Sequence, residues 1–137
     1  MRFISTNQAP KPGGHYSQGV QAAGLIFVSG MLPQGNNQPP MGFEAQVHSA
    51  LDHCSAVLAA ADCSFSDVVQ CTVYIVGVEN WPAFNQIYAE RFGEHRPARA
   101  VVPVPALHHG FLVEVQMVAE AGLKAHQAAQ RALEAKA

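Results

Sequence analysis

The stretch from Phe111 to Glu120, F-L-V-E-V-Q-M-V-A-E, constrains the fold more than any other part of the sequence. Successive side chains of a β-strand point to opposite faces of the sheet, so Phe111 and Leu112 begin two different rows. Both rows contain large apolar residues, which is typical of a strand in the interior of a sheet. The chain is therefore predicted to build a sheet with this strand at an inner position.

Five other segments have strand patterns, because they are rich in apolar, β-branched and aromatic residues and end at turn residues. They cover residues 2–5, 16–22, 23–33, 67–77 and 98–104. Apolar residues at helical spacing predict two amphipathic helices, over 43–61 and 81–92. The second helix has Asn80 as a possible N-cap and Pro82 in its first turn.

The order β-β-β-α-β-α-β-β predicts an α+β domain over residues 1–120, with both helices on one face of the sheet. Residues 34–42 have loop chemistry, and 121–137 are expected to form a polar helical tail. The other face of the sheet needs a cover, and a second copy of the chain is the simplest one. A charged fraction of only 13% also favours association, so we expect an oligomer.

Composition excludes several classes of protein. The chain has 137 residues, 49% of them hydrophobic, which is enough for one core. A formal net charge of −2 without a basic stripe argues against a nucleic-acid partner. No window approaches the roughly 18 apolar residues of a membrane span, and the N-terminus does not resemble a signal peptide. Three cysteines without C-x-x-C spacing suit a reducing compartment, so we expect a cytoplasmic protein.

Neither a metal nor a cofactor is expected. His108 and His109 could be combined with His95 or His48, but adjacent loop histidines usually point apart and no H-x-x-x-H or H-E-x-x-H spacing occurs. Ordinary loop residues are the favoured interpretation. No G-x-x-x-x-G-K or G-x-G-x-x-G loop is present to hold a nucleotide.

Two charged residues lie inside apolar strand patterns. Glu114 is costly to bury without a partner, so its pKa is expected to be perturbed, although a structural ion pair or a solvated strand edge would also explain it. Arg99 could hold a carboxylate with two parallel hydrogen bonds, but Arg96 competes for this role and either arginine could be a surface cation. A hairpin centred between Ala106 and Leu107 would set Arg99 opposite Glu114, but its Pro-rich connection leaves that register open.

Four motifs occur in order along the chain. They are G14-H-Y-S-Q-G19, V28-S-G-M-L-P33, N85-x-x-Y88, and R96-P-A-R-A followed by V113-E-V-Q-M-V-A. Together they resemble the RidA family, also called YjgF/YER057c/UK114, over about residues 4 to 120. Each motif alone is weak, but their order, with the expected strands and helices between them, makes the resemblance specific.

The resemblance implies a chorismate-mutase-like α+β fold, with two helices on one face of a mixed six-stranded sheet, assembled as a homotrimer with clefts between subunits. It also implies cofactor-independent hydrolysis of reactive 2-enamino and 2-imino acids to 2-keto acids and ammonia. By resemblance, Arg99 holds the substrate carboxylate and Glu114 positions water. Tyr16 would line the cleft from the adjacent subunit, and Ser29 and Gly30 would border it.

The sequence departs from the family pattern at two positions. Val101 replaces a cysteine that many members carry two residues after the arginine, although its backbone N–H can still donate to a carboxylate. Met31 stands where glutamine is common. These departures leave the substrate open, and with it the alternative of a regulatory module that binds a small carboxylate without turnover. Ribonuclease activity, with which members of the family have been labelled, is disfavoured by the acidic charge balance.

Overall fold

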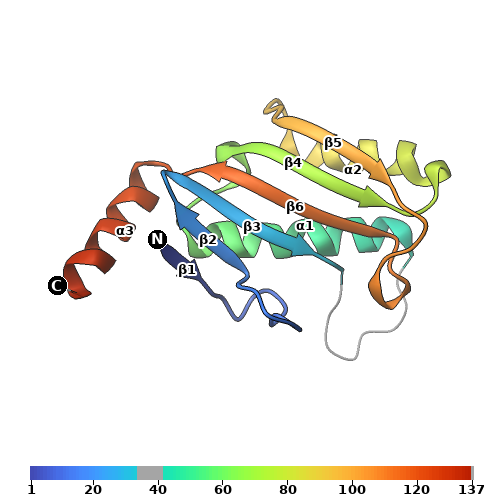
Figure 1. The fold of residues 1–137 in the computed structure, drawn as a ribbon. Coiled ribbons are helices and arrows are strands. Elements are labelled where there is room, and N and C mark those ends of the chain that lie inside the picture. Colours follow the sequence, from blue (N-terminus) through green and yellow to red (C-terminus); the bar gives the residue numbers. More distant parts are fainter. Residues whose placement is uncertain (34–41, 137) are drawn as a thin grey trace.

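The protein is described by a computed structural model over residues 1–33 and 42–136, and Figure 1 shows its single sheet backed by helices. The strands are β1 (Arg2–Ile4), β2 (Gly19–Ala22), β3 (Leu25–Met31), β4 (Val68–Ile75), β5 (Ala98–Pro103) and β6 (Val113–Glu120). The helices are α1 (Phe43–Ala60), α2 (Trp81–Phe92) and α3 (Leu123–Lys136). Apart from Gly42, the expected loop over 34–42 lies outside the described residues.

The sheet has the strand order β1-β2-β3-β6-β4-β5. The β4 and β5 strands are parallel and all other neighbours are antiparallel, so the sheet is mixed as predicted. The β6 strand lies between β3 and β4, which confirms the inner position expected from its two apolar rows. The hairpin considered around Ala106 does not form, because β5 follows a helical crossover from β4 and pairs with β4 instead of β6.

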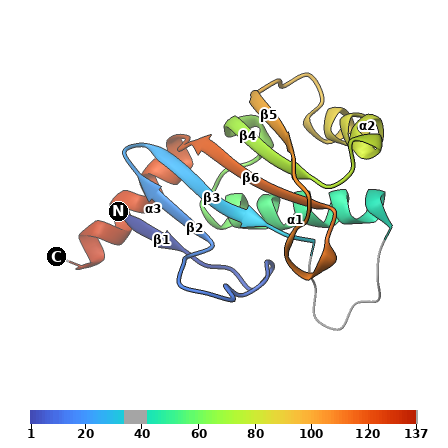
Figure 2. The ribbon, with the colours of Figure 1, turned by 45° about the vertical axis from the view of Figure 1, so that its right-hand side comes forward.

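The two faces of the sheet have different surroundings. Figures 1 and 2 show α1 and α2 on the same side of the sheet, as predicted. On this helix face, every second residue of β6, from Val113 to Ala119, is buried. Cys54 of α1 and Cys71 of β4 are both fully buried in the core, as expected for small apolar residues.

The opposite face, which we call the open face, carries a row of apolar side chains. Cross-strand pairing aligns Phe3, Val20, Phe27 and Val118 on four neighbouring strands. Phe3 is 67% exposed and Phe27 is 44% exposed. Large apolar side chains next to one another on an exposed sheet face are typical of a surface that another protein chain covers.

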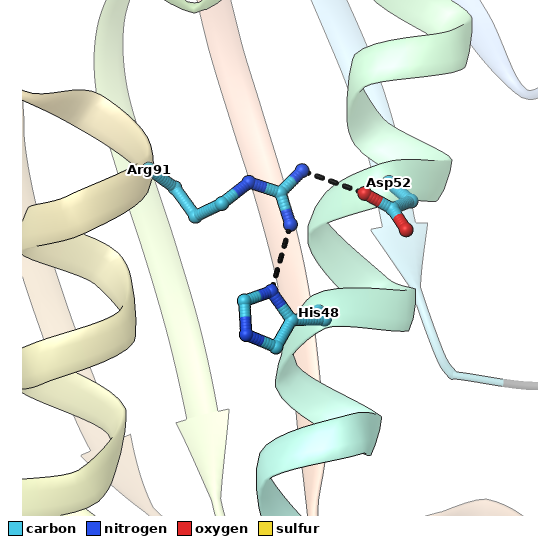
Figure 3. Close-up of polar contacts among 3 residues, drawn as sticks. All are labelled: His48, Asp52 and Arg91. Atoms are coloured by element: carbon cyan, nitrogen blue, oxygen red, sulfur yellow. Dashed lines mark hydrogen bonds and ion pairs between the residues drawn. The ribbon is translucent and has the colours of Figure 1, made fainter.

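A polar contact links the two covering helices (Figure 3). The guanidinium of Arg91 on α2 donates to Asp52 Oδ1 at 2.6 Å and to His48 Nδ1 at 3.1 Å, both on α1. Asp52 is largely exposed, so this contact contributes on the order of 0.2–1 kcal/mol and mainly sets how the helices lie side by side. The position of α2 is important because this helix supplies the aromatic rings that contact Arg99.

The third helix, α3, follows β6 in the chain. It begins near the C-terminal end of that strand, whereas Glu114 lies near the N-terminal end. It lies beside the N-terminal strand, with a groove of about 170 Å³ between Arg2 and Leu133. No helix in the described part of the chain is both long enough and apolar enough to cross a membrane.

Candidate functional site

Glu114 lies on the open face, near the start of β6. Its neighbours in the sequence, Val113 and Val115, point into the core, so the alternation of the strand turns the Glu114 side chain away from the helices. The side chain is half-buried, and this burial raises the pKa of its carboxyl group above the ordinary glutamate value. A carboxyl group of this kind exchanges its proton at a pH closer to neutrality than a solvated one.

Gly30 gives the Glu114 carboxylate its space. It lies in an irregular part of β3, where the pairing with β6 shifts register between Val28 and Met31. A Cβ atom at residue 30 would lie 2.5 Å from Glu114 Oε2, closer than real Cβ contacts, and 3.2 Å from its Cδ, which is tighter than most of them. The reason for glycine here is therefore the carboxylate beside it. The fold of one chain thus places Gly30 beside Glu114.

Ser29 anchors the neighbouring loop. Its hydroxyl donates to the Ser17 carbonyl at 2.6 Å, and its backbone N–H donates to the Gln18 carbonyl at 3.0 Å. The buried side-chain amide of Gln18 holds the same loop in place. Its Oε1 accepts a hydrogen bond from the Thr6 N–H, and its Nε2 donates one to the Thr6 carbonyl. The predicted strand over 16–22 accordingly starts only at residue 19, and residues 16–18 belong to a braced loop.

Tyr16 projects from this loop. Its side chain is 52% exposed, and its hydroxyl accepts a weak hydrogen bond from the Gly13 N–H at 3.4 Å. Because Ser29 ties the loop to β3 next to Gly30, the loop that carries Tyr16 lies at the same end of the sheet as Glu114. A ring that is exposed in one chain is available to contact a neighbouring one.

Arg99 lies on β5, at the edge of the sheet, above an aromatic surface formed by α2. Its guanidinium carbon is 5.0 Å from the centre of the Tyr88 ring and 5.9 Å from that of Phe84. These cation–π contacts hold the guanidinium without occupying its N–H donors. The residue is exposed, so those donors remain accessible to an anion.

A cavity of about 280 Å³ opens beside this arginine, between the end of α2 and the start of β5. Arg99, Arg96, His95 and Tyr88 are among the residues that line it. The His95 ring bonds to the Val68 carbonyl at 2.7 Å, which fixes the wall of the cavity to β4. Both candidate arginines therefore border one space, and Arg99 is the one held by the aromatic surface.

The two departures from the family pattern have different surroundings. Met31 is 5% exposed and pairs with Val115, so this change lies in the core and leaves the surface near Glu114 unaltered. Val101 is half-buried and packs against the core on the same side as Arg99. Cys71 pairs with Arg99, but burial raises the pKa of its thiol to about 12, so it stays protonated and does not replace the missing cysteine chemically.

Within one chain, Arg99 and Glu114 lie on opposite faces of the sheet. Arg99 is in register with the buried Cys71, which points to the helices. Glu114 is in register with Tyr74, whose neighbours Val73 and Ile75 are the buried residues of β4. Among the described residues, no hydrogen bond or ion pair joins the arginine to the glutamate. A small ligand can contact an arginine and a glutamate of this kind if the two residues come from different copies of the chain. Within one copy, it would have to reach around the β5 edge of the sheet.

Two residues near these groups were not singled out as site residues from the sequence. Tyr88 is part of the N85-x-x-Y88 motif, but its place under Arg99 depends on how α2 lies on the sheet. Tyr74 could be assigned to the open face from the alternation of β4, but its pairing with Glu114 requires the strand order.

Comparison with known proteins decides the family. The family model described as Endoribonuclease L-PSP matches residues 6–121 of the chain. The chain belongs to this family. The endoribonuclease L-PSP family is the one that contains the RidA proteins, so the resemblance of the sequence motifs is confirmed. The match ends before α3 begins.

Relatives of this L-PSP family protein carry two kinds of name. A RutC family protein of Pyrococcus horikoshii is 36% identical over 122 residues, covering 85% of this chain and 94% of its own. A protein of Capra hircus named 2-iminobutanoate/2-iminopropanoate deaminase is 36% identical over 124 residues, covering 88% and 90%. Among solved structures, E. coli TdcF with bound serine superposes with a TM-score of 0.84 at 28% identity, covering 89% of this chain and 100% of its own.

Proposed function

We propose that this protein hydrolyses reactive 2-enamino and 2-imino acids to 2-keto acids and ammonia without a cofactor. The observation that carries the proposal is the combination of an accessible guanidinium, Arg99, with a partly desolvated carboxyl group, Glu114, in a member of a family with named imine deaminases. The first group suits a substrate carboxylate and the second suits a reacting water.

The site forms, in this proposal, between two copies of the chain in a homotrimer. One copy supplies the β5 edge with Arg99 and Val101, and its neighbour supplies the open face with Gly30 and Glu114. The placement of Arg99 and Glu114 on opposite faces supports this division, because two copies can present opposite faces to one cleft. The apolar row of the open face supports a packed interface, and Tyr16 enters the cleft from the open-face copy.

The chemistry requires little machinery. The enamine first tautomerises to the imine, whose carboxylate Arg99 binds through two N–H donors. Glu114 takes a proton from water as the oxygen adds to the C=N carbon, and passes that proton to the imine nitrogen to give a carbinolamine. The hydroxyl proton of the carbinolamine then moves, through the same carboxylate, to the amino nitrogen. The C–N bond breaks, ammonia leaves, and the C=O bond of the keto acid forms. Such imines already hydrolyse in water, so orientation of one water and one carboxylate lowers the barrier sufficiently.

The proposal is tested by coupling the protein to an enzyme that generates 2-aminoacrylate from serine and following keto-acid formation. The wild type is expected to exceed the spontaneous rate. Arg99→Ala should abolish the acceleration, whereas Arg96→Ala, a matched change at the same cavity, should retain most of it. A wild-type rate equal to the spontaneous rate, or full activity in Arg99→Ala, would overturn the proposal.

The alternative of a carboxylate-binding module is separated by calorimetry. Binding of 2-ketobutyrate that depends on Arg99, without turnover of any imine in a panel, would favour that alternative.

A further inference from the structure

Tyr74 is the side chain directly opposite Glu114 in the sheet. The two residues pair across β4 and β6, and both are half-buried on the open face. Cβ atoms of such opposite residues lie about 4.5–5.5 Å apart. Gly30 stands on the other flank of Glu114 and has no side chain. The carboxylate is therefore open on the β3 side and bordered by a phenol on the β4 side.

A single carboxylate does not fix a water molecule. An ordered water needs about two to four polar partners, and Glu114 supplies only one group. Beyond Tyr74, the next residue of the same row is Val102 on β5, which is apolar. Side chains stand roughly perpendicular to a sheet, and tyrosine is longer than glutamate, so a phenol paired with Glu114 can extend its hydroxyl beyond the carboxylate. A water held between these two groups would face a substrate on the open face.

We propose that the Tyr74 hydroxyl is the second partner of the water that Glu114 activates. The proposal rests on the proposed deaminase function and adds a residue to it. The phenol O–H donates to or accepts from the water, while Glu114 takes the proton as the water oxygen bonds to the imine carbon. Tyr74 itself neither gains nor loses a proton in the balance of the reaction.

The next row of the open face on β4 and β6 is also polar. Thr72 and Gln116 pair with each other there, so both are one row farther from the carboxylate–phenol pair. Thr72 is diagonal to Glu114, and diagonal neighbours are about 7–8 Å apart, which is too far for one water to bridge readily from a short side chain. Thr72 therefore serves as the matched control, since it has a hydroxyl on the same strand and the same face.

The test compares Tyr74→Phe with Thr72→Val in the 2-aminoacrylate assay. Tyr74→Phe keeps the ring, so the oligomeric state by size-exclusion chromatography should not change. Its kcat should fall about 10- to 100-fold, the range for loss of one hydrogen bond to a buried polar group. Its KM should stay near the wild-type value, because Arg99 still binds the carboxylate. Thr72→Val should resemble the wild type in both constants.

The pH dependence of kcat distinguishes a water-positioning role of Tyr74 from a role in packing alone. If the hydroxyl and the water stabilise the Glu114 carboxylate, their loss raises its pKa further, and the acid limb of kcat moves to higher pH in Tyr74→Phe. The inference is overturned if an active wild type and Tyr74→Phe have equal kcat, if only KM changes, or if Thr72→Val loses as much activity. An inactive wild type would instead refute the proposed function.

Discussion

Replacing Gly30 by alanine separates catalysis from folding most sharply. The new Cβ would lie 2.5 Å from Glu114 Oε2, whereas ordinary van der Waals contacts of this kind begin at 3.4 Å, so the carboxylate must move by about 0.9 Å. A displacement near 1 Å at a reacting group costs on the order of 100-fold in rate. The atom that must yield is the end of a flexible side chain, so the loss of stability should stay within about 0.5–1.5 kcal/mol, the cost of one strained rotamer.

The assay is keto-acid formation from 2-aminoacrylate, with thermal unfolding measured on the same samples. Gly122→Ala is the matched control, because a Cβ there meets only Asp67 Oδ1, at an ordinary 3.7 Å. Gly30→Ala should lose about 100-fold in kcat while unfolding close to the wild type. Wild-type activity in Gly30→Ala would refute the reasoning, as would collapse of the fold.

Three further predictions follow from the same geometry. Tyr88→Leu should raise KM about two- to fivefold, since a cation–π contact at an exposed arginine is worth about 0.5–1 kcal/mol. Tyr88→Phe keeps the ring and should leave KM unchanged, as steady-state kinetics would show. Burial raises the folded-state pKa of Glu114, so the stability gained from its protonation is lost as pH rises through that pKa. Glu114→Gln should therefore unfold at a higher temperature than the wild type near neutral pH. The difference between the two unfolding temperatures should vanish below about pH 4, where the glutamate is protonated in both states. Removal of residues 123–137 should leave kcat unchanged in the same assay, because the family match ends at residue 121.

Much of the fold could be predicted from local patterns. The two apolar rows of β6 required an inner strand, and the helical spacing over 43–61 and 81–92 located α1 and α2 to within a few residues. Where the pattern failed, a specific contact explains it. The strand expected from residue 16 starts at Gly19, because the Gln18 side chain holds the preceding backbone in a loop.

The site could be predicted only in part. Arg99 and Glu114 stood out because a charge within an apolar strand needs a reason. Their placement on opposite faces depends on the insertion of β4 between β5 and β6, which no local pattern reveals. The steric role of Gly30 likewise depends on a carboxylate from a distant strand, and the sequence shows only a glycine.

Mixing two inactive variants tests most directly whether the site is shared between copies. Arg99→Ala and Glu114→Gln are co-expressed in equal amounts, and the mixed oligomers are assayed for 2-aminoacrylate hydrolysis. If each cleft takes its arginine from one copy and its glutamate from the neighbour, one cleft in four receives both, and about one quarter of wild-type activity should return in a trimer. If both residues serve the cleft from the same chain, the mixture should stay as inactive as its parents, and the shared site would be contradicted.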